Sequence, residues 1–244
     1  MKDEKQYWAN RADMYNNLDW VKDPGYMKDI IESVEFNKSD IVLDFGGGTG
    51  AVSDVLCPLV DKVFCVDISQ EMLNQNQTKY NKYLVSWDLS KTQLFADCIF
   101  NKIVARMAFH HIIENTQKSM DQCYKMLKHG GEMILSEAVP PHPSLKKDFA
   151  EIFALKEDRL TFNVEDLSDL MDRAGFDKIR WIKYIIPDFS LNNWLDNNVD
   201  EITKKKIFDL HYNGSDFFKE QYNLREVGDD ILIKVTKIIM VGEK

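Results

Sequence analysis

The sequence is poor in the residues that build metal and disulfide frameworks. It has 4 cysteines and 5 histidines in 244 residues, and Cys57, Cys65, Cys98 and Cys123 form no C-x-x-C pair and no cluster at zinc spacing. We therefore expect no metal site. Three of the cysteines lie within apolar runs, which is typical of small buried side chains in a reduced, cytoplasmic protein.

A long apolar run without charges is also lacking. The opening MKDEKQYWANRADMY has no hydrophobic segment of the kind found in a signal peptide. The C-terminal run ILIKVTKIIMV carries Lys234 and Lys237, which makes a membrane span there unfavourable. We expect a soluble chain without a membrane partner.

Positive charge is in the minority. There are 31 Lys and Arg residues against 40 Asp and Glu residues, so the formal net charge is −9. Such a chain repels nucleic-acid phosphates unless it has a local basic patch. The tightest basic run, residues 204–206, alternates with acidic stretches and indicates a solvated helix face. The charge predicts no nucleic-acid partner, and the oligomeric state stays open.

The chain does contain a regular alternation of strand-length apolar runs with segments of helical periodicity, which is typical of a parallel α/β sheet. No crossover helix pattern fits between the last two runs, so we expect an antiparallel hairpin at the sheet edge. The predicted fold is one domain over residues 1–244, with a doubly wound, mostly parallel seven-stranded sheet and an antiparallel last strand. The expected strands are residues 41–45, 62–68, 83–89, 98–109, 131–139, 178–186 and 229–244.

Two segments exceed a minimal fold of this kind, at about residues 139–161 and 187–228. Insertions at the carboxyl end of a parallel sheet set the shape of a substrate site. We expect these two to cap an acceptor pocket.

The stretch VLDFGGGTGAVSDVL holds four glycines within five residues between a strand and a helix. Glycines at Gly46, Gly48 and Gly50 allow a tight turn and let a ligand lie against the backbone. In a doubly wound sheet, ligands bind at this edge. The pattern D-x-G-x-G-x-G starts at Asp44, but GGGTGA also fits the weaker dinucleotide fingerprint.

Acidic residues favour an adenosine cofactor with an amino-acid end. Asp67, followed by Ile68, ends the second expected strand, where its carboxylate can accept both hydroxyls of a ribose. Asp88 can accept a hydrogen bond from an adenine amine, and the Leu89 N–H can bind a ring nitrogen. Asp44 can anchor a cationic amino group, whereas it would repel the phosphates of NAD.

The ordered segments LDFGGGTG, VFCVDIS, SWDL, NKIVARMAFHHI and LKHGGEMILSE resemble the motifs of class I S-adenosylmethionine-dependent methyltransferases. The resemblance spans roughly residues 7–137 and is greatest to the small-molecule subgroup that includes quinone and sugar methyltransferases. It implies S-adenosyl-L-methionine as cofactor and S-adenosyl-L-homocysteine as product. It also implies that the three glycines flank the methionine part, while the two acids after the strands hold ribose and adenine.

In related enzymes an aromatic N-terminal helix closes over the cofactor. The resemblance implies this role for Tyr7, Trp8 and Tyr15. The alternative is that these aromatic residues only pack a terminal helix against the sheet.

The acceptor side is expected beyond the fourth and fifth strands. His110 resembles the histidine that acts as base in some sugar O-methyltransferases, and Glu137 stands where those enzymes carry an acid. His111 is expected to cap the following helix or to contact substrate, and His142 is a weaker candidate for the same pocket. Arg106 is expected to bind either the cofactor carboxylate or an anionic acceptor.

We therefore predict methyl transfer to a small molecule, with a hydroxyl acceptor favoured and an anionic metabolite as one possibility. Two other functions stay open. One is an NAD-dependent oxidoreductase, although the only Tyr-containing candidate, YKMLK at Tyr124, lies in an amphipathic helix. The other is a non-catalytic protein of the same fold that binds the cofactor.

Overall fold

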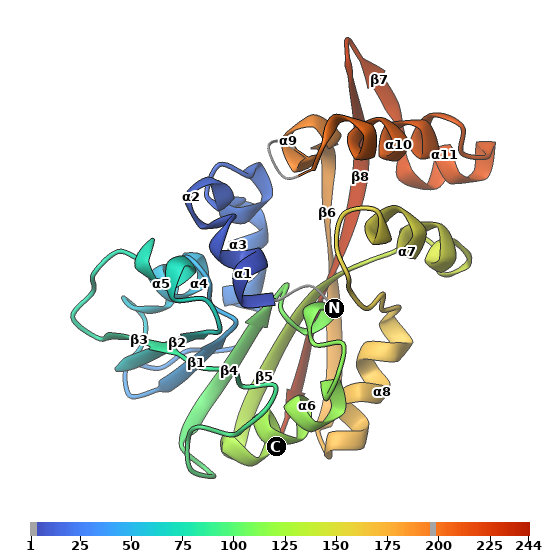
Figure 1. Cartoon of the computed structure of the whole chain (residues 1–244). Helices are drawn as coiled ribbons and strands as arrows, with labels where there is room; N and C mark the ends of the chain where they lie inside the picture. The colour runs from blue at the N-terminus through green and yellow to red at the C-terminus, as the bar shows by residue number, and fades with distance from the viewer. Residues whose placement is uncertain (1–3, 196–198) are drawn as a thin grey trace.

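The computed structural model describes residues 4–195 and 199–244, and an eight-stranded sheet forms its centre (Figure 1). The strand order is β3-β2-β1-β4-β5-β8-β6, and β7 pairs with β8. Strands β1 to β5 pair in parallel, and β8 runs antiparallel to both of its neighbours. The strands are β1 (Ile41–Phe45), β2 (Lys62–Asp67), β3 (Lys82–Ser86), β4 (Phe100–Arg106), β5 (Leu127–Val139), β6 (Asp177–Ser190), β7 (Arg225–Val227) and β8 (Asp230–Glu243).

The predicted α/β fold with an antiparallel last strand is confirmed, and so is the antiparallel pair at the sheet edge, which β6 and β8 form. One detail is corrected, because a short eighth strand, β7, extends the sheet beside β8. Within the edge pair, β8 lies between β5 and β6, and β6 is the edge strand. The burial of the two strands accounts for this order. Ile238 to Met240 are fully buried and need neighbours on both sides, whereas Trp181 of the edge strand β6 is 48% exposed.

Helices cover both faces of the sheet (Figure 1). Helices α3 and α4 pack on one face, and α6 and α8 pack on the other. The helices are α1 (Glu4–Ala9), α2 (Ala12–Tyr15), η1 (Asp19–Lys22), α3 (Pro24–Glu32), α4 (Ala51–Leu56), α5 (Gln70–Asn74), η2 (Phe109–His111), α6 (Thr116–Met126), η3 (Pro143–Leu145), α7 (Lys146–Ala154), α8 (Val164–Ala174), α9 (Leu191–Leu195), α10 (Glu201–Tyr212) and α11 (Asp216–Tyr222).

Local signals fix several of these boundaries. The Asp23 side chain accepts a hydrogen bond from the Tyr26 N–H at the start of α3, and Pro24 occupies the first turn. The Ser69 hydroxyl caps α5 in the same way. Gly175 ends α8 in the left-handed conformation, with φ of 99°. Because β1, β2 and β4 are parallel, the loops that follow them lie together at the carboxyl ends of the strands.

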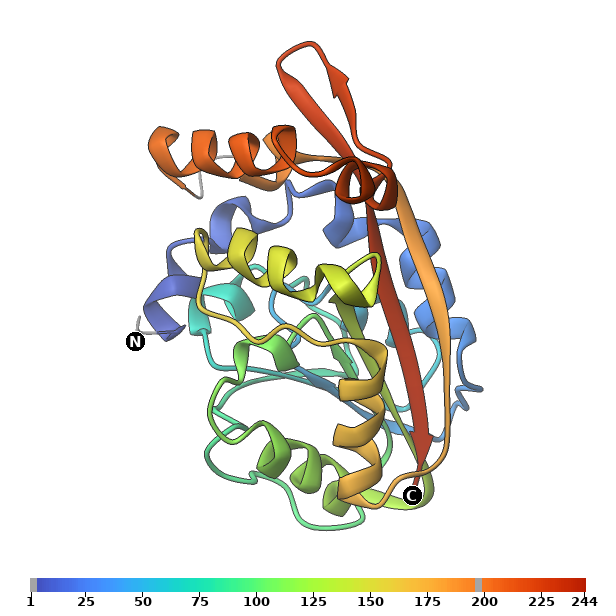
Figure 2. The same cartoon turned by 90° about the vertical axis from the view of Figure 1, so that its right-hand side faces the viewer.

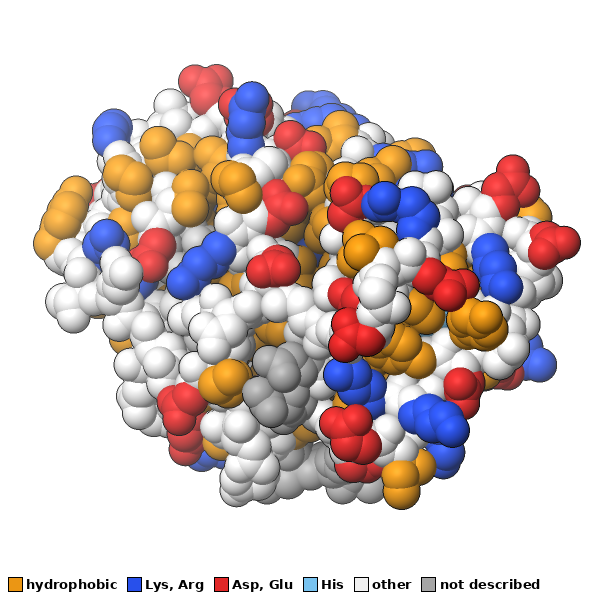
Figure 3. All heavy atoms as spheres, turned by 90° about the horizontal axis from the view of Figure 1, so that it is seen from above, with side chains coloured by type: hydrophobic (Ala, Val, Ile, Leu, Met, Phe, Trp, Pro, Cys, Tyr) orange, Lys and Arg blue, Asp and Glu red, His pale blue; other side chains and the backbone are white. Residues whose placement is uncertain are grey.

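The two extra segments pack together beyond the carboxyl ends of the parallel strands. Helix α7 comes from the first, and α9 to α11 come from the second, which starts after Ser190 because β6 runs further than its apolar run predicts. Figures 1 and 2 show α9 to α11 at one end of the molecule, with the C-terminus at the other. Seen from this end, hydrophobic side chains are interspersed with acidic and basic ones (Figure 3).

The described residues contain no helix that could cross a membrane. None of the helices there combines the length and the apolar character that a bilayer span requires.

Candidate active site

The glycine loop is tied to its helix by a buried carboxylate. Asp44 Oδ2 accepts hydrogen bonds from the Ser53 N–H at 3.0 Å and from Ser53 Oγ at 2.6 Å. Burial raises the pKa of Asp44 to about 6, although the Ser53 hydrogen bonds oppose the shift. Asp44 thus holds the first turn of α4 in place, and it also lines the cavity above the loop.

The Asp67 carboxylate connects the loop that follows β1 to the loop that follows β2. Its Oδ2 accepts a hydrogen bond from the Gly48 N–H at 2.9 Å, and its Oδ1 accepts one from the Ser69 N–H at 2.9 Å. Gly48 has φ of 53°, and a Cβ there would lie 3.2 Å from Met72 Cε. A side chain at this position would therefore strain the loop and crowd the cavity.

A cavity of about 370 Å³ lies above these loops. It brings together most of the residues predicted to bind the cofactor, which come from the ends of β1, β2, β3 and β4 and from the N-terminal segment. The predicted residues that line it are Tyr15, Asp44, Gly46, Gly48, Asp67, Ile68, Asp88, Leu89 and Arg106. Trp8 lines it as well, so the N-terminal segment closes one side of the cavity.

Two further charged side chains of the cavity, besides Asp44 and Asp67, also have protein partners. Asp88 Oδ1 accepts hydrogen bonds from the Ser90 N–H at 3.0 Å and Ser90 Oγ at 2.5 Å, and its Oδ2 lies 3.0 Å from Lys91 Nζ. Arg106 Nη1 donates to the Val21 carbonyl at 2.8 Å. Both side chains are thereby fixed in orientation before any ligand binds.

A second cavity of about 80 Å³ adjoins the first. The two share Trp8, Tyr15, Met107 and His111 as lining residues. Met107 has φ of 55°, which is uncommon for a residue with a side chain. The walls of the second cavity also come from α7, α9, α11 and β8, so the two extra segments enclose it.

His110 and Glu137 form a buried pair at this second cavity. His110 Nδ1 lies 2.6 Å from Glu137 Oε2, while Glu137 Oε1 accepts from the Phe109 N–H at 2.8 Å and the His110 N–H at 3.3 Å. Burial lowers the pKa of His110 well below its usual range and raises that of Glu137 to about 7. The two backbone donors stabilise the carboxylate, so Nδ1 carries the proton and Nε2 keeps its lone pair.

Comparison with known proteins identifies the central part of the chain. Residues 43–135 match the family described as a methyltransferase domain. Phosphoethanolamine N-methyltransferase from Plasmodium falciparum is 24% identical over 201 residues, which cover 79% of this chain and 70% of that protein. Ribosomal RNA small subunit methyltransferase A from Rippkaea orientalis is 31% identical over 103 residues, covering 37% of this chain and 38% of that protein.

The fold agrees with solved structures. The YcgJ protein from Bacillus subtilis superposes with a TM-score of 0.81 at 19% identity, over 90% of this chain and 98% of that one. Residues 43–135 therefore form a methyltransferase domain, and the chain as a whole has the Rossmann-like methyltransferase fold. In this methyltransferase the larger cavity lies where a doubly wound sheet binds its ligand.

Four predicted site residues of the methyltransferase line neither cavity: Tyr7, Gly50, His142 and Glu137, which lies behind His110. Tyr7 lines neither of them, and its hydroxyl donates to Glu157 Oε2 at 2.6 Å. Gly50 serves packing, because a Cβ there would lie 1.9 Å from Asn76 Oδ1. His142 is exposed and accepts a hydrogen bond from the Ser144 N–H in the turn that starts η3.

Other predicted residues are divided between the two cavities. Of the two cavities, Arg106 lines only the larger one. His111 lines both, and its ring centroid lies 4.8 Å from that of Trp8. His110 lines only the smaller cavity, with Glu137 buried behind it.

Sequence reasoning missed a group of charged residues around the smaller cavity. Lys156, Glu157 and Arg159 follow α7, outside the recognised motifs. Glu157 lies 3.2 Å from Lys156 Nζ and 3.5 Å from Arg159 Nη1. Arg11 joins them by donating to the Tyr7 hydroxyl. A run of four charged residues, KEDR, was the only signal of this group in the sequence.

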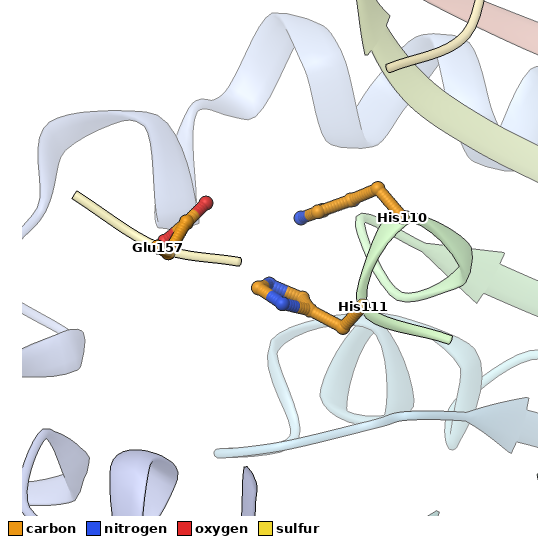
Figure 4. A group of neighbouring side chains, drawn as sticks. All are labelled: His110, His111 and Glu157. Atoms are coloured by element: carbon orange, nitrogen blue, oxygen red, sulfur yellow. The ribbon is translucent and has the colours of Figure 1, made fainter. Parts of the chain in front are cut away.

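One subset of this methyltransferase's residues has the composition of a metal site. His110 and His111 point from η2 toward Glu157 on the facing loop (Figure 4), and one ligand atom from each lies within 4.8 Å of the others. However, Glu157 already pairs with two cations, and Arg11 adds a third nearby positive charge. Further positive charge is unfavourable in such surroundings, so these charges disfavour a metal ion at this group.

Proposed function

We propose that this protein transfers the methyl group of S-adenosyl-L-methionine to a small molecule and releases S-adenosyl-L-homocysteine. The single observation that carries this proposal is the pair of adjoining cavities. Methyl transfer from a sulfonium is an in-line displacement, which needs the acceptor atom on the far side of the methyl carbon from sulfur. A cofactor in the larger cavity and an acceptor in the smaller one would meet at the shared wall.

The cofactor would lie with its ribose at Asp67 and its adenine near Asp88 and Leu89. Its methionine end would lie over Gly46 and Gly48. Arg106, fixed on the Val21 carbonyl, would face the cofactor carboxylate. This orientation would direct the sulfonium toward Met107 and His111, which line both cavities.

For a hydroxyl acceptor, His110 would act as general base. The acceptor oxygen attacks the methyl carbon, the carbon–sulfur bond breaks, and its electron pair stays on sulfur. The hydroxyl proton passes to Nε2 of His110, and Glu137 stabilises the resulting imidazolium through Nδ1. The carboxylate held by two backbone N–H groups supports this assignment.

The size and enclosure of the smaller cavity support a small acceptor, and the segments at about 139–161 and 187–228 would act as its cap. A relative named for phosphoethanolamine methylation, with 70% of its length covered, also supports a small acceptor. The quinone or sugar subgroup stays a prediction.

Turnover tests the proposal directly. Purified protein is incubated with S-adenosyl-L-methionine and a panel of small alcohols, phenols, amines and acids, and S-adenosyl-L-homocysteine is quantified. We expect acceptor-dependent product, with a hydroxyl compound among the substrates. Cofactor binding without turnover on any acceptor would favour the non-catalytic alternative, and turnover on amines only would contradict O-methylation.

A further inference from the structure

Five basic side chains line the smaller cavity, and four of them, from three separate segments, are buried. Arg11 follows α1, Lys156 and Arg159 follow α7, and Lys237 lies on β8. All four are more than nine-tenths buried: Arg11 is 8% exposed, Lys156 7% and Lys237 2%, and the Arg159 side chain is 2% exposed. Buried cations at this density are unfavourable unless negative charge balances them.

The acidic groups facing this cluster are too few to balance it. Glu157 pairs with Lys156 and Arg159 and accepts the Tyr7 hydroxyl. The other buried acid, Glu137, is committed to His110 and two backbone N–H groups. Asp23 also lies near enough for its charge to act on Lys237, but it accepts hydrogen bonds from the Tyr26 N–H and the Tyr184 hydroxyl, and Arg106 adds a further positive charge near Lys237. Within the described part of the chain, three carboxylates therefore face the four basic side chains.

Three donors in the cluster lack a hydrogen-bond acceptor within the described residues. They are Arg11 Nε, Arg159 Nη2 and Lys237 Nζ, and each is buried. Buried polar groups are nearly always hydrogen-bonded, so three such donors at one cavity indicate a ligand that accepts from them.

Aromatic rings solvate these cations without neutralising them. Lys237 Nζ lies 3.9 Å from the centroid of the Tyr26 ring and 4.3 Å from that of Trp20. The Arg159 guanidinium lies 4.2 Å from the centroid of Phe153. Cation–π contacts of this kind hold a cation in place but leave its N–H groups available to an anion.

We propose that the smaller cavity binds an oxyanion of the methyl acceptor, a carboxylate or a phosphate, through Arg11, Arg159 and Lys237. This rests on the proposed function, because it specifies the acceptor's class. The cavity of about 80 Å³ has room for more than a single water molecule. Arg106, which faces the larger cavity, leaves these three residues to recognise the acceptor.

Lys237 gives the sharpest test because no carboxylate is hydrogen-bonded to it in the described structure. Inorganic phosphate and acetate are each titrated by calorimetry into protein saturated with S-adenosyl-L-homocysteine. We expect at least one of them to bind in the millimolar range, and Lys237→Met to weaken that binding at least tenfold. Arg159→Lys, which keeps the charge beside Glu157 but removes the Nη2 donor, should weaken it as well.

The matched control is Lys147→Met, on the same side of the molecule in α7, where the side chain is 87% exposed. It should leave phosphate and acetate binding unchanged. The melting temperature supplies a second readout. Lys237→Met removes a buried unbalanced cation, so the ligand-free variant should melt at the same temperature as the wild type or higher. A merely structural lysine would lower it.

The proposal is overturned if neither anion binds at tens of millimolar, or if Lys237→Met binds the anion as the wild type does. Loss of both stability and anion binding in Lys237→Met would assign Lys237 a structural role and also contradict it. Binding of S-adenosyl-L-homocysteine is measured on the same samples. Normal cofactor binding without anion binding would reject only the anion site, whereas failure of cofactor binding would reject the proposed function itself.

Discussion

The pair formed by His110 and Glu137 determines where a proton can be accepted. The hydrogen bond at 2.6 Å places one proton between Nδ1 and Oε2. A second proton on the pair gives one of two states. Either His110 is an imidazolium beside an ionised Glu137, or Glu137 is protonated and donates to Nδ1 of a neutral His110. In both states Nε2 of His110 carries a hydrogen. One added proton is therefore enough to remove the base.

This gives a pH dependence with a definite sign. The pKa of Glu137 is raised to about 7, so turnover on a hydroxyl acceptor should fall as the pH drops through about 7. In Glu137→Gln the amide donates to Nδ1 and leaves the hydrogen on Nε2, so turnover should be low and nearly independent of pH over that range. A pH–rate profile that is unchanged in Glu137→Gln would contradict the assigned role.

The same carboxyl also affects stability. Its folded pKa is raised above the value of about 4.3 for an unfolded chain, so its contribution is most favourable below that pH and is lost as the pH rises through about 7. Glu137→Gln should therefore gain stability relative to the wild type between about pH 5 and pH 8, by up to roughly 3 kcal/mol. Urea unfolding of both proteins at the two pH values measures this gain, and a loss would contradict it.

Removing the base separates chemistry from cofactor binding. His110→Ala should lower turnover on a hydroxyl acceptor by about 10²–10⁴-fold, because general base catalysis contributes that much. Affinity for S-adenosyl-L-homocysteine should stay the same, since His110 lines only the smaller cavity. Steady-state kinetics and calorimetry on the same preparation check both parts. Parallel losses would instead indicate damage to the fold.

The glycine loop illustrates how one motif serves two purposes. Gly48 approaches the cavity, whereas Gly50 makes room for Asn76, whose Nδ2 donates to the Gly48 carbonyl at 2.8 Å. Asn76 thereby fixes the loop from outside the motif. The spacing of the glycines predicted a tight turn, but it could not show which glycine faces the cavity, because Asn76 follows α5 and lies outside the motif.

A paired substitution tests this division. Gly50→Ala should be more destabilising than Gly130→Ala, although both positions have positive φ, of 83° and 74°. A left-handed alanine costs about 1–2 kcal/mol at either site, but only at Gly50 does the new Cβ collide, at 1.9 Å from Asn76 Oδ1. Thermal unfolding of the two variants measures the difference. Equal melting temperatures would contradict the packing role.

The N-terminal helices form one wall of both cavities. Trp8 and Tyr15 line both cavities, and their ring centroids lie 5.8 Å apart. A cofactor in the larger cavity would bury these rings further. We expect S-adenosyl-L-homocysteine to slow amide hydrogen exchange in α1 and α2, with α8, which lines neither cavity, as the internal control. Unchanged exchange in α1 and α2 with bound ligand would contradict a closing role.

Across the molecule, local sequence patterns predicted the strands and the fold class well. The alternation of apolar runs and helices predicted strands β1 to β5 and placed the ligand site at their carboxyl ends. The insertion of β8 between β5 and β6 was not predictable, because strand order depends on which surfaces remain to be covered. Lys237 shows the same limit. In the sequence it only interrupts an apolar run, whereas the fold places it with Arg11 and Arg159.

Methyl transfer by this protein requires that the larger cavity bind the adenosine cofactor. Calorimetry with S-adenosyl-L-homocysteine tests this most directly, with Asp67→Ala and NADH as comparisons. We predict micromolar affinity, about −8 kcal/mol, a loss of at least tenfold in Asp67→Ala because hydrogen bonds to a charged group are removed, and no heat with NADH. The absence of heat and of any thermal shift with millimolar S-adenosyl-L-homocysteine, or binding of NADH in its place, would contradict it.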